Sequence, residues 1–146
     1  MDILEGVSLT PLKIIPHPKG DIMHALKGSE PDFKGFGEAY FSTVNTGEIK
    51  GWKMHHRMVL NLVVPAGKIR FVLFDERPES ESYGKTWEVI ISAQNYQRLT
   101  VPPLVWMAFQ GLGDETNLLL NIASIEHDPK EAEGRSIEEI DFKWEM

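Results

Sequence analysis

The stretch "KGWKMHHR", residues 50–57, concentrates basic side chains in a chain that is acidic as a whole. Its basic residues are Lys50, Lys53, His55, His56 and Arg57. Imidazoles can ligate a metal ion or act as a general base, and ammonium and guanidinium groups can bind an anion. The stretch can also be only the solvated end of a strand, because the apolar segment "MVLNLVV" follows directly.

Strand periodicity divides these side chains between two faces. Alternate residues of an extended segment share a face, and one such face carries Lys53, His55, Arg57 and Asn61. Gly51 marks a place for a β-bulge, which would bring Lys50 to the same face. We expect this face to line a cavity, with solvated surface as the alternative. For Asn61 the alternative is a hydrogen-bonded core amide.

The spacing of the stretch resembles the first metal-binding signature of cupin barrels, G-x5-H-x-H-x3,4-E-x6-G. Its five fixed positions fall on Gly47, Lys53, His55, Leu60 and Gly67. Only one of the three ligands, His55, is therefore present, and the His of the second cupin signature falls on Met107. A single imidazole beside a protonated lysine is a poor site for a divalent cation. The sequence predicts no metal and no other cofactor.

Composition excludes several classes of protein. The chain has 146 residues and a net charge of −7, so a general nucleic-acid binder is not expected and an anion must be held by a local patch. There is no cysteine, which fits a reducing compartment. Neither a signal peptide nor an apolar run long enough for a membrane span is visible. We expect a cytoplasmic protein that does not enter a membrane.

Short apolar runs separated by turn residues dominate the chain. The predicted strands are "GEAYFSTVN", "RMVLNLVVP", "KIRFVLFDE", "TWEVIIS", "QRLTVP", "VWMAFQGL", "NLLLNIASI" and "IEEIDFKW". The best candidate for a helical turn is "HDPKEAEGR". Strands at this spacing predict an all-β sandwich or barrel. With the cupin spacing, they predict a cupin-type jelly-roll β-barrel that forms a single domain over residues 1–146.

A longer segment, "DERPESESYGKTWEVIISAQNYQRLTVPPLVWMAF", spans Asp75 to Phe109. It resembles the dTDP-4-dehydrorhamnose 3,5-epimerase family, with its D-x-R-x-x-S-P-T-F-G-K-W, S-A-x-N and L-x-I-P-x-G-F-x-H-G-F motifs. The residues in step are Asp75, Arg77, Ser80, Gly84, Lys85, Ser92, Ala93, Asn95, Leu99, Pro102 and Phe109. The upstream "GEIKGWKMH" resembles G-V-L-R-G-L-H-x-Q of the same family.

The resemblance implies an activity, a ligand and an assembly. The family binds a nucleotide diphosphate sugar in the barrel, usually as a homodimer with an exchanged N-terminal segment. It removes a proton beside the 4-keto group of the sugar and returns it on the other face. The family's functional positions fall on Lys19, His24, Lys50, Lys53, His55, Met107 and Glu126, or on His127 in place of Glu126. At each of these positions the residue type differs from the family's.

Two classes of function follow. The first is a nucleotide-sugar epimerase or isomerase acting on a 4-keto-6-deoxy hexose in surface-polysaccharide biosynthesis. In it His55 is the simpler base, Lys53 steadies an enolate or phosphate, and Glu126 or His127 takes the place of the family's Tyr acid. Substrate contacts are expected from Lys19, His24, Lys50, Arg57, Asn61 and Trp106. The second is a non-catalytic barrel that binds a carbohydrate or nucleotide sugar.

Overall fold

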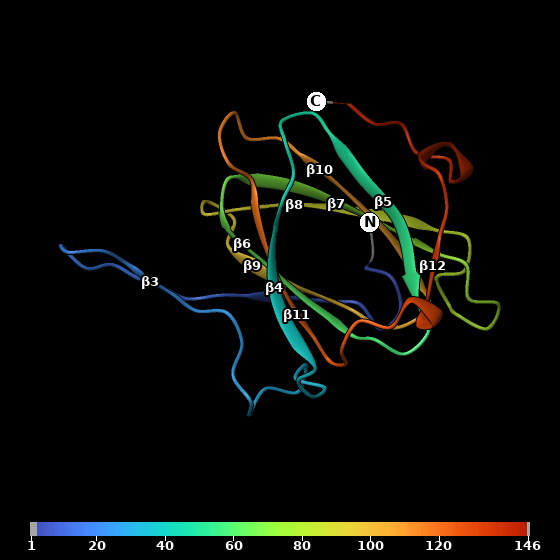
Figure 1. Ribbon diagram of the computed structural model, residues 1–146, viewed down its shortest axis with the longest axis horizontal. Helices are drawn as coiled ribbons and strands as arrows, with labels where there is room; N and C mark the ends of the chain where they lie inside the picture. Colours follow the sequence, from blue (N-terminus) through green and yellow to red (C-terminus); the bar gives the residue numbers. More distant parts are fainter. Residues whose placement is uncertain (1–2, 146) are drawn as a thin grey trace.

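The computed structural model describes residues 3–145, and its regular secondary structure is almost entirely β-strand (Figure 1). One five-stranded sheet has the order β1 (Ser8–Pro11), β9 (Gln97–Val101), β6 (Leu60–Ala66), β11 (Leu118–Ala123), β4 (Glu38–Thr43). The other has the order β12 (Ala132–Gly134), β5 (Ile49–His55), β10 (Val105–Gly111), β7 (Lys68–Asp75), β8 (Thr86–Ser92). The predicted all-β class is confirmed. Among the described residues, no helix has the length and apolar character that crossing a membrane requires.

A small hairpin leaves the barrel near the N-terminus. Its strands are β2 (Ile14–Ile15) and β3 (Ile22–Met23), and it projects well beyond the two large sheets (Figure 1). Two short 3₁₀ helices lie near the other end of the chain, η1 (Pro129–Glu131) and η2 (Ile137–Glu139). The helical turn expected in "HDPKEAEGR" is therefore one 3₁₀ turn that leads into strand β12. The strand expected in "IEEIDFKW" is instead η2 followed by irregular chain.

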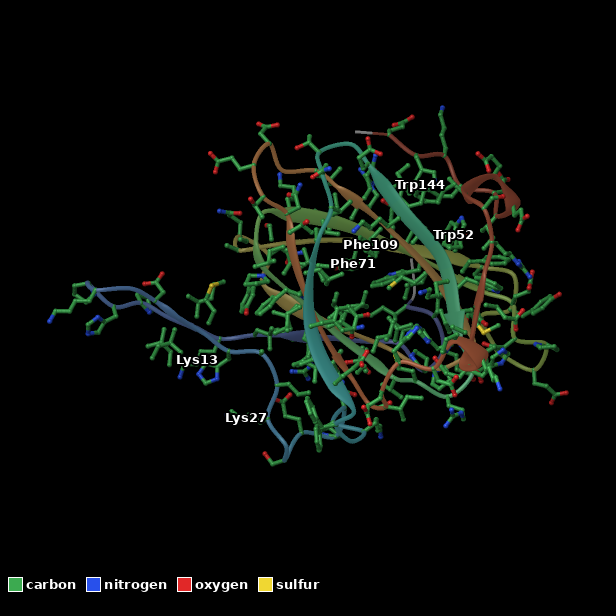
Figure 2. All side chains as sticks on the ribbon, in the orientation of Figure 1. Lys13, Lys27, Trp52, Phe71, Phe109 and Trp144 are labelled. Carbon is green, nitrogen blue, oxygen red and sulfur yellow. The ribbon has the colours of Figure 1, made fainter. Side chains whose placement is uncertain are left out.

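The main core lies between the two large sheets. Alternate residues of β6 and β7 enter it, among them Leu62, Val64, Phe71 and Leu73, all nearly inaccessible to solvent. The rings of Phe71 and Phe109 meet near its centre, 5.9 Å apart (Figure 2). This packing fixes which side of each central strand faces inward.

A second apolar cluster covers the outer side of the β5–β10–β7 sheet. Trp52, Trp106 and Ile140 are buried in it, and the C-terminal segment closes it (Figure 2). The indole N–H of Trp52 donates to the carbonyl of Ile137 at 3.1 Å, and the rings of Trp52 and Trp144 lie 6.0 Å apart. Since neighbouring side chains of a strand alternate, anchoring Trp52 outward directs the next residue, Lys53, inward.

The segment with the strongest family resemblance has a structural role at the end of β7. The buried carboxylate of Asp75 accepts hydrogen bonds from the guanidinium of Arg77, at 2.8 Å from Nε, and from the hydroxyls of Ser80 and Ser82. Burial alone would raise the pKa of Asp75, but these hydrogen bonds outweigh it and hold the pKa well below its usual value. The loop also holds the N-terminal chain, because Ser82 Oγ accepts from the amide of Glu5.

Replacing Asp75 by Asn should therefore destabilise the fold. We expect Asp75→Asn to lower the free energy of unfolding at pH 7 by about 3 kcal/mol, since Arg77 loses its buried partner. A depressed pKa adds stability above the unfolded carboxyl value of about 3.9 and loses it as the pH falls further, so the difference should shrink below about pH 4. Urea unfolding at several pH values measures this. The exposed Asp114→Asn is the control, and equal stability of both variants at pH 7 would contradict the role of Asp75.

Candidate active site

A cavity of about 340 Å³ opens between the two large sheets. Its volume is in the range of small-molecule sites. Strands β4, β6 and β11 of the first sheet form one wall, and β5 and β10 of the second sheet form the opposite wall. The lining residues are Tyr40, Ser42, Lys50, Gly51, Lys53, His55, Leu60, Leu62, Met107, Phe109, Leu119 and Asn121.

A bulge in β5 brings both lysines to the cavity. In the β5–β10 register Met107 pairs with Lys53 and Phe109 pairs with Lys50. A step of two residues along β10 thus corresponds to a step of three residues along β5. The register shift falls at Gly51, which confirms the predicted bulge. Gly51 has a φ of 135°, and a Cβ there would lie 2.6 Å from the Cα of Ala108, so only glycine fits. Both lysines stay exposed to solvent in the cavity, so neither bears the cost of burying a charge.

The last residue of β5, His55, is held by a buried carboxylate. Its Nδ1 is hydrogen-bonded to Oε1 of Glu131, which is 3% exposed. The other oxygen, Oε2, accepts from the backbone amides of Arg57 at 3.0 Å and Met58 at 3.2 Å. Glu131 thus connects η1 to the turn between β5 and β6 and fixes the imidazole at the cavity wall.

The ionisation of Glu131 determines which ring nitrogen of His55 carries the proton. Burial would raise the pKa of Glu131, but hydrogen bonds from His55 and the two backbone amides outweigh it and lower the pKa below its usual value. An ionised carboxylate only accepts hydrogen bonds, so Nδ1 of a neutral imidazole must be protonated. Nε2 is then left with a lone pair that can accept a proton from a ligand.

Leu104 supports His55 from the neighbouring turn. Its backbone amide donates to the carbonyl of His55 at 2.7 Å, and its φ is 72°. This left-handed conformation is unfavourable for a leucine, and the residue occupies the glycine position of the family's P-x-G motif.

Two residues predicted to share the face of Lys53 and His55 lie elsewhere. Arg57 is exposed, with a guanidinium nitrogen 3.6 Å from a carboxylate oxygen of Asp128. Asn61 is buried on the other side of β6, where its amide donates to the carbonyl of Asp32 at 3.0 Å and accepts from Thr100 at 2.7 Å. Strand β5 ends at His55, and after a turn β6 starts in the other sheet. The alternation of side chains along β5 therefore does not predict which face Arg57 or Asn61 lies on.

Trp106 also lies outside the cavity. It is 2% exposed in the outer cluster, with the guanidinium carbon of Arg135 4.2 Å from its ring centroid. Met107, the next residue of β10, faces the cavity in its place. Strand alternation explains the difference. The indole packs in the outer cluster, makes the cation–π contact with Arg135 and donates a hydrogen bond to the carboxylate of Glu76.

The remaining predicted residues do not line this cavity. Lys19, Glu126 and His127 are exposed, and His24 is half-buried. Glu126 and His127 lie on the loop between β11 and η1. Lys19 lies in the turn of the projecting hairpin, and His24 directly follows its second strand (Figure 1). Figure 2 shows Lys13 and Lys27 on the chain segments that lead to and from this hairpin, away from the middle of the barrel.

Sequence reasoning missed four polar residues of the site, three of which line the cavity. Tyr40 and Ser42 come from strand β4 and Asn121 from β11, and all three line the wall opposite His55. Alternation along "GEAYFSTVN" places Tyr40 and Ser42 on one face, but nothing in the sequence indicates that this face is inward. Glu131 was missed because its segment is rich in charge and resembles a solvated turn.

The groups of the site that can do chemistry are two lysine ammonium groups and the imidazole of His55, which Glu131 holds in place. Within residues 3–145, no group of three or more His, Cys, Asp or Glu side chains is arranged to hold a metal ion. Lys50, Lys53 and His55 together form a wall that can bind an anionic or enolate oxygen and accept a proton from carbon.

Comparison with known proteins gives a consistent result. The family model for dTDP-4-dehydrorhamnose 3,5-epimerase matches residues 4–146. A probable low-salt glycan biosynthesis epimerase of Haloferax volcanii is 24% identical over 123 residues, 83% of this chain and 79% of the relative. The spore coat polysaccharide biosynthesis protein SpsL of Bacillus subtilis is 23% identical over 146 residues, 97% of each chain.

Solved structures agree with the cupin-type fold. A dTDP sugar isomerase from Desulfovibrio desulfuricans superposes with a TM-score of 0.93 at 36% identity, covering 99% of this chain and 95% of that one. A 3'-monoepimerase from Streptomyces bikiniensis, in complex with dTDP, gives a TM-score of 0.87 at 16% identity and covers 97% and 76%. The predicted jelly-roll barrel is confirmed.

The His55–Glu131 pair makes a prediction that needs no substrate. In Glu131→Gln, the amide oxygen should keep the two backbone donors, so the amide NH₂ should face Nδ1 of His55. Neutral His55 should then change from the Nδ1–H to the Nε2–H tautomer. Ring ¹⁵N chemical shifts of the parent and variant measure this change. His56, an exposed neighbour paired with Glu133, should show no change, and an unaltered His55 tautomer would count against the assigned role of Glu131.

Proposed function

Because the chain belongs to the dTDP-4-dehydrorhamnose 3,5-epimerase family, we propose that it is an epimerase or isomerase of a nucleotide-linked 4-keto-6-deoxy hexose. The observation that carries the proposal is the His55–Glu131 pair beside Lys50 and Lys53 at one cavity. The names of the relatives from H. volcanii and B. subtilis support a role in the biosynthesis of a surface polysaccharide.

The proposed base is His55. Its Nε2 would remove the proton from a carbon next to the ketone, leaving an enolate and an imidazolium. The Glu131 carboxylate supports this step because its negative charge stabilises the imidazolium that forms. In the family's pattern the basic His stands where this chain has Lys53, so the base is proposed to have moved two residues along β5.

Lys50 and Lys53 are proposed to stabilise negative charge. An enolate oxygen and a diphosphate both attract ammonium groups, and an enolate gains most when its charge develops in the transition state. Nζ of Lys50 donates to the carbonyl of Thr43 at 2.6 Å, which holds its charge on the side of the cavity facing β4. The overall charge of −7 repels a nucleotide sugar, so binding depends on this local patch.

The proposed assembly is a homodimer. The outer face of β4 and β11 carries apolar side chains, including Phe41, Leu120 and Ile122. Phe36 lines a shallow groove on this face together with Ala39. Phe36 and Phe41 are each 65% exposed, which is unusual for aromatic side chains of a monomer. The hairpin with Lys19 and His24 projects from the barrel, and we propose that it is the segment exchanged with the second copy, as in the family.

Solvent exchange tests the proposed reaction. The parent protein, incubated in deuterated water with a nucleotide-linked 4-keto-6-deoxy hexose, should place deuterium on a carbon next to the ketone. His55→Gln, which restores the family's residue, should bind the nucleotide sugar but reduce labelling at least about 100-fold, the usual contribution of a general base. His56→Gln is the matched control and should label like the parent. Binding of the sugar without labelling by the parent would favour the non-catalytic barrel.

Calorimetric titration tests the lysines. Lys53→Met keeps the length of the side chain and removes its charge, so nucleotide-sugar binding should weaken by about 1.5–3 kcal/mol, the value of a hydrogen bond to a charged group. Added salt should weaken binding less in the variant than in the parent. Lys143→Met, at a side chain that is 89% exposed, should bind like the parent. An unchanged affinity of Lys53→Met would show that the basic residues at the end of β5 are only solvated and do not bind the nucleotide sugar.

Light scattering tests the dimer. In a two-fold symmetric dimer a carboxylate in place of Phe41 would be buried without a partner in the apolar contact of both copies, so Phe41→Glu should convert a micromolar dimer into a monomer. Tyr83→Glu, at an exposed aromatic residue of the loop after β7, should leave the dimer intact. A parent protein that is already monomeric at micromolar concentration would remove the proposed assembly.

A further inference from the structure

Tyr40 faces the cavity from the sheet opposite His55. It lies on β4, which belongs to the first large sheet, whereas His55 lies on β5 of the second. Both side chains line the same cavity. A ligand ring bound between the two sheets would therefore present one face to the imidazole and the other to the phenol.

The hydroxyl of Tyr40 is oriented by a buried amide. Asn121 is directly opposite Tyr40 in the β4–β11 register, is 5% exposed, and donates from Nδ2 to the Tyr40 oxygen at 3.0 Å. A phenol oxygen that accepts this hydrogen bond keeps its own proton available for another acceptor. Donation from Asn121 also stabilises negative charge on the oxygen once that proton has left.

Resting on the function proposed above, we propose that Tyr40 is the acid that returns a proton to the sugar on the face opposite His55. His55 takes the proton from the carbon next to the ketone, and the electrons of the C–H bond move into the enolate. The O–H bond of Tyr40 then breaks and leaves its electrons on the phenol oxygen. The C=C electrons of the enolate bind the released proton as the new C–H bond, and a lone pair of the enolate oxygen restores the ketone. Tyr40 remains as a phenolate, and both side chains recover their protonation states by exchange with water.

The geometry also selects between two reactions. An acid and a base on opposite faces of a ring invert a carbon, whereas moving a keto group along the ring requires no inversion. The site is thus that of an epimerase. Glu126 and His127, the acids expected from the sequence, lie on an exposed loop outside the cavity, and Tyr40 supplies a phenol from a different strand.

The test separates removal of the proton from its return. The parent, Tyr40→Phe and the control Tyr83→Phe are incubated in deuterated water with a nucleotide-linked 4-keto-6-deoxy hexose. NMR follows both deuterium at the carbon next to the ketone and inversion of that carbon. Tyr40 is 46% exposed, so loss of its hydroxyl leaves the core intact.

In Tyr40→Phe, inversion should fall at least about 100-fold. Labelling with retained configuration should stay within about tenfold of the parent's rate, because His55 can return a solvent deuteron to the face it attacked. Tyr83→Phe should match the parent. Three results would each overturn the role of Tyr40 and leave the proposed function standing. They are inversion by Tyr40→Phe at the parental rate, an equal loss of labelling and inversion in Tyr40→Phe, and labelling without inversion by the parent. A parent protein that labels nothing would overturn both.

Discussion

The buried carboxylate of Glu131 is the constraint on which the site depends. It joins three segments that are distant in sequence, because it accepts from His55 at the end of β5 and from the amides of Arg57 and Met58 in the following turn, while it belongs to η1. Removing it would leave two backbone donors and an imidazole without partners in a poorly solvated place, which costs more than the net value of the bonds themselves. The interaction therefore sets both the path of the chain and the tautomer of the proposed base.

Strand β5 directs three residues of the basic cluster, Lys50, Lys53 and His55, toward the cavity. Its outward side is anchored by Trp52 in the cluster that the C-terminal segment closes, and its inward side carries Lys53 and His55. The bulge at Gly51 adds Lys50 to the inward side. An acidic chain can thus hold a cationic wall, since the positive groups remain in an open cavity and need no ion pairs to offset burial.

The fold and half of the site could be predicted from the sequence. Short apolar runs with turn residues between them predict the barrel, and Gly51 beside two lysines predicts the shared face of Lys50 and Lys53. Alternation fails for Asn61 because a turn intervenes, and the resemblance fails to locate Trp106 because packing on the outer face decides its side. Glu131 meets His55 across 76 residues, and no local pattern signals a contact that only the folded barrel creates. Tyr40 shares this difficulty, since its partner Asn121 lies 81 residues away.

In the proposed mechanism, the buried carboxylate of Glu131 makes His55 a base within a cationic cavity. The most direct measurement is the rate of solvent-deuterium incorporation into a nucleotide-linked 4-keto-6-deoxy hexose by the Glu131→Gln protein, beside its affinity for the same sugar. The affinity of Glu131→Gln should stay close to the parent's, because Lys50 and Lys53 are untouched, while incorporation should fall at least about 100-fold. Incorporation at the parental rate by a folded Glu131→Gln protein would contradict this mechanism.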